Sequence, residues 1–291
     1  MKTNVCYQGD CLEVMKGIED KSVDMILVDP PYKVISGGNK SKEAGWHGSV
    51  LEKNDGKIFQ HNDIKFSEYL SELFRILKDG SHCYVMVNFI NLNELLTESK
   101  KAGFEQHNLL VWEKNNKVLS RWYMKNAEYI LFLYKKPAKK INNIGTPTIL
   151  KANNPRNKIH PTEKPVKLLE IMINNSSKEN DIIFDCFAGS GSLAIACKNL
   201  NRNFILIEQD EEYCEIIKER VNCEIIKPSF YSTTGIDQAI KEQEEDNIKA
   251  NKEIDIKHEI NLDKCPKCNG RLKKTKYGMT CEDCFWEIES K

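Results

Sequence analysis

The sequence predicts an α/β protein built on a doubly wound, mostly parallel sheet, with a smaller unit at its C-terminus. Short apolar runs of the length of buried strands alternate with segments of helical periodicity, most regularly over residues 181–221. Strands that alternate with helices pair in parallel, because each helix carries the chain back to the same end of the sheet. Residues 263–291 break this alternation, since they hold two Cys-x-x-Cys pairs in a stretch too short for a hydrophobic core.

Strands and helices are expected to alternate through the first hundred residues. The helix after residue 65 is predicted from apolar residues at helical spacing, such as Phe66 and Leu70, and Lys78-Asp79-Gly80 is expected to end it. Residues 33–62 lack periodicity, so we predict a functional loop or a segment that orders only on binding. The expected strands are 5–8, 23–28 and 83–87, and the expected helices are 11–18, 66–78 and 91–102.

The second half of the main domain continues the pattern. Thr162-Glu-Lys-Pro165 is predicted to open a helix that runs to about residue 174, with Thr162 or Glu163 as its cap and Pro165 in its first turn. Residues 137–159 are expected to form a loop. The other expected strands are 107–112, 128–134, 181–186 and 203–208, and the other expected helices are 192–200 and 211–221. The predicted organisation is a main domain at 1–227, an acidic linker at 228–262 and the small unit at 263–291.

Charge is segregated along the chain although the net charge is zero. Residues 111–160 hold eleven Lys and Arg against two Glu, interleaved with aromatic residues such as Trp112 and Trp122. Residues 237–263 hold nine Asp and Glu against four Lys. A basic segment with aromatic residues suits contact with phosphates and stacking on bases, although a solvated basic surface is the simpler alternative. The segments 33–62 and 113–159 are therefore the candidates for reading a nucleic-acid target.

The remaining composition limits where the protein works. No run is apolar and long enough to span a membrane, and the N-terminus has no signal-peptide core. Eleven cysteines without a secretory signal favour reduced thiols in the cytosol, some of them on a metal. We therefore expect a cytoplasmic protein with no membrane partner, in which the seven cysteines before residue 230 are small core residues.

Four residues, Asp29-Pro30-Pro31-Tyr32, follow the apolar run 23–28 and carry the first chemical signal. The two prolines end the strand because neither can donate to a neighbouring strand. The result is a stiff strand end with a carboxylate, the free carbonyl of Pro30 and an aromatic ring. That set suits a planar ring bearing an amino group, with two acceptors for its N–H bonds and a surface to stack on. Taken alone, the four residues also suit a Pro-Pro turn with a solvated Asp and a half-buried Tyr.

A glycine-rich turn carries the second signal. Phe184-Asp-Cys-Phe-Ala-Gly189-Ser-Gly191-Ser follows one expected strand and opens a helix. Glycines allow the backbone to approach a ligand closely. Glu208 ends the next strand about 20 residues later, where a carboxylate can hold two ribose hydroxyls. No Gly-Lys-Ser/Thr follows the turn, so a nucleoside cofactor without phosphates fits better than ATP.

Taken in order, three motifs resemble the β class of DNA amino-methyltransferases. They are Asp29-Pro-Pro-Tyr32, His160-Pro-Thr-Glu-Lys-Pro165 and Phe184-Asp-Cys-Phe-Ala-Gly-Ser-Gly191. The resemblance covers about residues 4–222. It implies a Rossmann-like methyltransferase fold that uses S-adenosylmethionine (SAM) to methylate exocyclic nitrogens of double-stranded DNA, as in restriction-modification. Dimers are common in this class, so a homodimer is compatible with it.

The resemblance also implies roles for individual residues. Asp29, Pro30, Pro31 and Tyr32 would form the catalytic motif, with Asp29 and the Pro30 carbonyl on the amine and Tyr32 stacked on a flipped base. Thr162 and Lys164 would lie near the cofactor carboxylate, and Glu208 would bind the ribose. Asp10 would accept from the adenine amino group of the cofactor, or serve only as a turn residue. The turn residues expected at the cofactor are Asp185, Phe187, Gly189, Ser190 and Gly191.

Within the class, Asp at position 29 is associated with N6-adenine and Ser with N4-cytosine, so we expect an adenine-specific enzyme. An N4-cytosine enzyme, an enzyme acting on RNA or protein, and a DNA-binding protein without activity stay open as alternatives. Two acceptors on the amine would favour a pyramidal nitrogen, so direct transfer requires orientation more than a strong base.

The C-terminal cysteines carry a separate signal. Cys265-Pro-Lys-Cys268 and Cys281-Glu-Asp-Cys284 are two knuckles with a spacing that suits tetrahedral Zn²⁺. Metal binding would drive folding in so short a unit. The unit resembles a zinc ribbon of the kind appended to nucleic-acid enzymes. A DNA contact and a purely structural or protein-binding role are both open.

Overall fold

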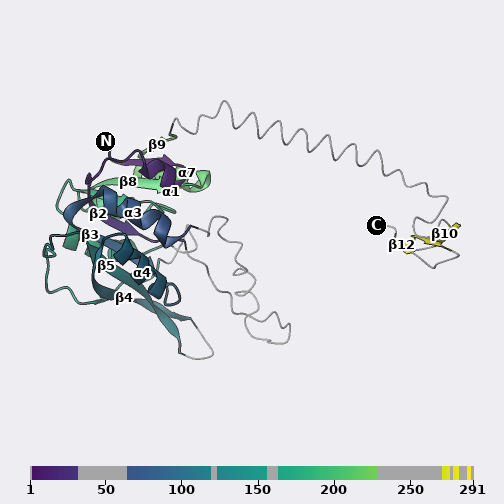
Figure 1. Ribbon diagram of the computed structural model, residues 1–291, viewed down its shortest axis with the longest axis horizontal. Helices are drawn as coiled ribbons and strands as arrows, with labels where there is room; N and C mark the ends of the chain where they lie inside the picture. Colours follow the sequence, from purple (N-terminus) through teal and green to yellow (C-terminus); the bar gives the residue numbers. More distant parts are fainter. Residues whose placement is uncertain are drawn as a thin grey trace. The chain divides into compact units, whose positions relative to one another are not determined.

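The computed structural model describes residues 2–31, 64–118, 123–155, 163–228, 271–275, 278–281 and 287–289. The chain divides into two compact units, Met1–Ser229 and Phe230–Lys291. The first unit is drawn with most of its elements labelled in Figure 1. Within the described residues, no helix is long and apolar enough to cross a membrane.

One large sheet organises the first unit. Its order is β6-β4-β5-β3-β2-β7-β8-β1-β9. Every neighbouring pair is parallel except β3·β5 and β4·β5, so β5 alone runs against the other eight described strands. The strands are β1 (Val5–Gln8), β2 (Val23–Val28), β3 (Leu77–Val87), β4 (Glu105–Val118), β5 (Lys125–Tyr134), β6 (Ile149–Lys151), β7 (Ile182–Asp185), β8 (Asn203–Glu208) and β9 (Glu224–Ile226). The prediction of a mostly parallel α/β sheet is confirmed.

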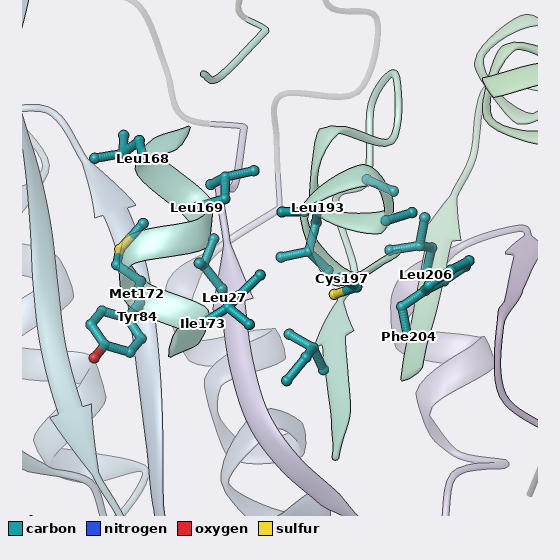
Figure 2. Packing of buried hydrophobic residues seen from close by; sticks show 14 of the residues in the cluster. Leu27, Tyr84, Leu168, Leu169, Met172, Ile173, Leu193, Cys197, Phe204 and Leu206 are labelled. Atoms are coloured by element: carbon teal, nitrogen blue, oxygen red, sulfur yellow. The ribbon is translucent and has the colours of Figure 1, made fainter. Parts of the chain in front are cut away.

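Helices cover both faces of this sheet. The buried apolar residues of α1 (Cys11–Met15), α3 (Phe66–Ile76) and α4 (Leu92–Lys101) belong to one cluster, and those of α5 (Val166–Ser176), α6 (Ser192–Asn199) and α7 (Glu211–Val221) belong to the other. Successive strand residues alternate between the two clusters, as in Ile26 and Leu27 of β2. Figure 2 shows the second cluster, in which Leu169 and Ile173 of α5 lie beside Leu27.

The winding reverses between β2 and β7, which are neighbours in the sheet. After β2 the chain enters α3 on one face, whereas after β7 it enters α6 on the other. The carboxyl ends of the strands at such a reversal are the usual ligand site of an open α/β sheet. Asp29 follows β2 and Asp185 ends β7, so two of the predicted site residues lie at this point.

Several predicted boundaries are wrong. Lys78-Asp79-Gly80 does not end α3 but lies within β3, where the Gly80 N–H donates to the Lys135 carbonyl over 2.8 Å. Pro165 is the N-cap of α5 and not part of its first turn, and α5 runs to Ser176. The sequence prediction missed β6 and β9, which have only three residues each. It also made β4 and β5 too short, because the outer part of β4, Glu113–Lys117, is a polar run without the alternation of a strand; the long hairpin is visible in Figure 1.

The seven cysteines before residue 230 are all free and buried, as the sequence predicted. The second unit contains a small antiparallel sheet of β10 (Leu272–Thr275), β11 (Gly278–Cys281) and β12 (Glu287–Glu289). Cys281 ends β11, whereas Cys265, Cys268 and Cys284 lie outside the described residues.

Candidate active site

The predicted site residues come together at the carboxyl edge of four adjacent strands. Asp29 follows β2, Asp185 ends β7 and Glu208 ends β8. The Gly9 N–H that precedes Asp10 donates to the Glu208 carbonyl over 2.9 Å, which brings the end of β1 to the same place. The carboxylates of Asp29, Asp185 and Glu208 are far apart in the sequence but thus lie at the same edge of the sheet.

The glycine-rich turn connects β7 to α6 through two residues with left-handed backbone. Gly189 has φ 51° and Gly191, the N-cap of α6, has φ 79°. A Cβ at Gly191 would lie 2.9 Å from Cγ1 of Ile217 on α7. Glycine is therefore required at position 191 both for its backbone angle and for the close approach of α7. The turn presents its backbone beside Glu208 without a large side chain at these two positions.

Glu208 is fixed by backbone donors. Its Oε2 accepts from the Gly189 N–H over 2.7 Å, and its Oε1 accepts from the N–H groups of Gln209 and Asp210 over 2.9 and 3.0 Å. Burial raises the pKa of Glu208, and these backbone donors act in the opposite direction. The carboxylate is thereby held in one orientation at the end of β8.

Asp185 is the most enclosed of these acids, with 6% of its surface exposed. Its Oδ1 accepts from the Phe187 N–H over 2.9 Å. Burial raises the pKa of Asp185 to about 8, with the charges of Asp29 and Glu208 adding to the effect. The Phe187 ring lies edge-on to the Tyr69 ring at 5.1 Å between centroids.

Asp10 has a visible structural role. Its Oδ1 accepts from the N–H groups of Leu12 and Glu13 over 2.8 and 3.2 Å, which caps α1. The turn-residue alternative therefore holds for one oxygen of Asp10. The predicted contact with a cofactor stays a prediction.

Within the described part of the chain, the partners of Asp29 are side chains and not backbone groups. Its Oδ2 forms an ion pair with Nζ of Lys164, which comes from the loop before α5. The same ammonium lies 3.6 Å from Oε2 of Glu128 on β5, and Oε1 of Glu128 pairs with Nζ of Lys114 on β4. Burial raises the pKa of Asp29, while Lys164 and then Lys114 oppose the rise. Burial also raises the pKa of Glu128, but Lys164 and Lys114 more than offset it and leave the pKa below its ordinary value.

A second buried ion pair braces the glycine-rich turn. Arg220 on α7 donates from Nη1 to the Ser190 carbonyl over 2.6 Å and to the Ser190 hydroxyl over 3.0 Å. Its Nη2 donates to Oε1 of Glu163 over 2.7 Å, and the Glu163 side chain is 5% exposed. Glu163 and Lys164 are consecutive, so one dipeptide contacts both the turn and Asp29.

The structure thus brings together every predicted site residue of the main domain that it describes. Tyr32 and Thr162 lie outside the described residues, as does the side chain of Cys281. No cluster of His, Cys, Asp and Glu within the described part of the chain could hold a metal ion. The residues that sequence reasoning missed are Lys114, Glu128, Glu163 and Arg220. Charged residues are common in this sequence, and only Glu163 lies in one of the motifs. The role of these four residues is therefore visible only in the folded structure.

Comparison with known proteins gives a consistent result. Residues 23–219 match the family model N6_N4_Mtase, described as DNA methylase. The chain is 30% identical over 237 residues to the Type II methyltransferase M2.MboI of Moraxella bovis, covering 74% of this chain and 86% of that protein. It is 29% identical over 259 residues to the Type II methyltransferase M.HpaI of Haemophilus parainfluenzae, covering 80% and 77%.

Solved structures agree on the fold. The crystal structure of the M1.HpyAVI-SAM complex matches with a TM-score of 0.57 and 26% identity, over 74% of this chain and 99% of that one. The cytosine-N4-specific PvuII DNA methyltransferase matches with a TM-score of 0.57 and 16% identity, over 78% and 97%. The second likeness concerns the fold alone.

Proposed function

Since the chain belongs to the N6/N4 DNA methylase family and is a DNA methyltransferase, we propose that it transfers a methyl group from SAM to N6 of a flipped-out adenine in double-stranded DNA. The observation that carries this proposal is the position of Asp29 at the reversal between β2 and β7, next to the glycine-rich turn. The choice of adenine rests on Asp at position 29, where Ser would favour N4-cytosine.

An N4-cytosine enzyme is the second candidate. It is kept because the matched family, N6_N4_Mtase, is named for both kinds of product. The same acceptors, Asp29 and the Pro30 carbonyl, could hold the amino group of either base. The two candidates therefore differ in the product that is formed and not in the reaction type.

The residues present fit SAM. Two glycines with left-handed backbone lie beside the half-buried Glu208 carboxylate, which could hold ribose hydroxyls. M1.HpyAVI, which is similar to this chain, is known in complex with SAM. When bound, SAM supplies an electrophilic methyl group on a sulfonium that leaves readily. We propose that Asp10, Thr162, Lys164, Asp185, Phe187, Gly189, Ser190, Gly191 and Glu208 line its site.

The chain's own contribution to the reaction would be orientation. Asp29 and the Pro30 carbonyl would accept the two amino protons of the target base, which favours a nitrogen lone pair directed at the methyl group. The target must leave the duplex to reach this edge, and Tyr32 would stack on it. Asp29 need not remove a proton before attack.

The proposed organisation is a catalytic domain at 1–227 with target-recognition segments near 33–62 and 113–159. An acidic linker at 228–262 and a zinc ribbon at 263–291 complete it. The proteins similar to this chain are Type II methyltransferases, which supports a role in restriction-modification in the cytoplasm. A homodimer is also compatible with this proposal.

One experiment tests the base and the activity together. DNA from cells that express the full chain would be sequenced by a method that reports methylated bases and compared with DNA from cells that express Asp29→Ala. N6-methyladenine at a recurring site, absent from the Asp29→Ala cells, is the expected result. N4-methylcytosine at such a site would select the second candidate, and unmodified DNA together with no transfer of tritiated methyl groups would contradict both.

Zinc is proposed separately. Cys265, Cys268, Cys281 and Cys284 have the spacing of a tetrahedral thiolate site, and Cys281 ends strand β11 of the small sheet. Elemental analysis of the purified full chain should give about one zinc per chain, and less for Cys265→Ser. Equal zinc in both proteins would contradict this assignment.

A further inference from the structure

Four charged side chains form an alternating row beside the candidate catalytic motif. In order they are Asp29, Lys164, Glu128 and Lys114, so two acids alternate with two bases. The exposed fractions of the side chains are 23%, 10%, 27% and 18%. Charges this enclosed interact strongly with one another, because water screens them little. A change at one end of the row should therefore be felt at the other.

The row weakens Asp29 as an acceptor. The proposed reaction needs a carboxylate oxygen of Asp29 to accept from the target amine, and the Lys164 ammonium on Oδ2 offsets the negative charge that both oxygens share. A lysine ammonium has three donors and can contact more than one acceptor. Glu128 provides a second anionic partner, since its Oε2 forms an ion pair with the same Nζ over 3.6 Å.

We propose that Glu128 is a positioning residue for methyl transfer, whose carboxylate shares the Lys164 ammonium with Asp29 and so leaves Asp29 able to accept from the target amine. The inference rests on the proposed function, because it concerns the residue assigned to the amine. Lys114 weakens the attraction between Glu128 and Lys164, since its ammonium pairs with the other oxygen of Glu128.

The surroundings of Asp29 fix the direction of the expected pH effect. Lys164 and Lys114 lower the pKa of Asp29, whereas burial and the charge of Glu128 raise it. Asp185 faces Asp29 from β7, and Tyr69 faces it from α3. Tyr69 stays neutral because burial raises its pKa well above its ordinary value. The same Asp185 faces Asp29 in the wild type and in the variants of Glu128 and Lys114, so a difference between their pH profiles reports the altered residue.

The first test is Glu128→Gln in the full chain. Without the negative charge, Lys164 binds Asp29 more tightly, so kcat at saturating DNA and SAM should fall about tenfold. The acidic limb of the kcat–pH profile should move to lower pH, because one charge that raises the Asp29 pKa is lost. The affinity for SAM, measured by equilibrium dialysis, should change less than about threefold.

A matched control is Glu105→Gln. Glu105 begins β4 at the opposite edge of the sheet and pairs with Lys136 over 2.6 Å. The Glu105→Gln variant also removes one acid–lysine pair, but at the edge of the sheet away from Asp29. Its kcat and the acidic limb of its kcat–pH profile should therefore stay at wild-type values. If Glu128→Gln also leaves both at wild-type values, the proposal is overturned.

Lys114→Met supplies a second route that does not depend on the folding of Glu128→Gln. It frees Glu128 to draw Lys164 away from Asp29 and removes a charge that lowers the Asp29 pKa. The acidic limb should therefore move to higher pH, opposite to the shift for Glu128→Gln. Shifts in the same direction, or no shift with Lys114→Met, would contradict the sharing of Lys164.

Failure of this inference differs from failure of the proposed function. If the wild type transfers methyl groups to DNA and Asp29→Ala does not, the proposed role of Asp29 stands whatever Glu128→Gln does. If Asp29→Ala transfers as well as the wild type, the proposed function of the site fails first.

Discussion

The two sides of the candidate active site are held in different ways. On the glycine-turn side, residues 185–192 and Glu208, the acids accept from backbone N–H groups of nearby residues. On the Asp29 side, Asp29 and Glu128 are held by the ammonium groups of Lys164 and Lys114. Backbone donors are fixed by the turn itself, whereas the lysines come from other elements. The glycine-turn side should therefore tolerate side-chain changes better than backbone changes. The Asp29 side should tolerate backbone changes better than side-chain changes.

The largest expected effect tests the Asp29 side. Asp29→Ala should lower methyl transfer by at least about a thousandfold, because the target amine loses its charged acceptor. The affinity for SAM should stay within about threefold of wild type, and Lys164 keeps Glu128 as a partner. Tritiated-methyl transfer and equilibrium dialysis measure the two quantities.

Asp79→Ala is the control for that variant, since the exposed Asp79 pairs with Lys21 and lies on β3 at the opposite edge of the sheet. Its methyl transfer should equal that of the wild type. Lost SAM binding with an unchanged chemical step in Asp29→Ala would reverse the assignment of the two sides.

Gly191→Ala tests the glycine-turn side with the smallest change of side chain. The new Cβ would lie 2.9 Å from Ile217 and would occupy a backbone with φ 79°, so the turn must move. We expect SAM affinity to fall roughly 10- to 100-fold, or about 1.4–2.8 kcal/mol. Gly17→Ala is the matched control, because its Cβ would meet only the Val14 carbonyl at an ordinary 3.5 Å. Equal SAM affinity in both variants would show that the turn does not hold the cofactor.

Arg220→Met asks whether the side-chain brace of the turn matters as much as its backbone. The variant removes three hydrogen bonds, two to Ser190 and one to Glu163, and leaves the buried Glu163 without this partner. SAM affinity should fall about tenfold, with kcat at saturating SAM near wild type. Lys218→Met on the same helix removes an exposed pair with Glu215 and should have no effect. A loss of kcat alone in Arg220→Met would place Arg220 on the Asp29 side.

The smallest expected effect concerns the pH dependence of stability. The pKa of Asp185 is raised from 3.8 to about 8, so the folded state holds a proton that the unfolded state releases. Its contribution to stability is full below pH 3.8 and is lost as the pH rises to about 8. Asp185→Asn keeps an acceptor for the Phe187 N–H but cannot ionise, so its Tm at pH 8 should exceed that of the wild type by roughly 2–4 °C. Differential scanning calorimetry without SAM measures this, and an equal or lower Tm would contradict it.

The difference between the two sides of the site also explains which site residues the sequence predicts. The glycine-rich turn and Glu208 were found from sequence because spacing and strand ends are local properties, and the turn's own backbone completes the site. Glu128 was missed because its partner Lys164 comes from a loop far along the chain, and Lys114 was missed because it pairs with Glu128 only across the β4–β5 hairpin. The end of α3 was misplaced for a related reason, since pairing of Leu77–Gly80 in β3 outweighs the local signal of Lys78-Asp79-Gly80.

By itself, the sequence determined the α/β class, the alternating elements from 181 to 221 and the positions of Asp29, Asp185 and Glu208 at strand ends, because these depend on periodicity and turn chemistry. Only the tertiary structure decided that β5 runs against its neighbours, that β6 and β9 extend the sheet, and that one lysine lies between Asp29 and Glu128. The physical reason is that charges act through space, while the signals of a sequence act along the chain.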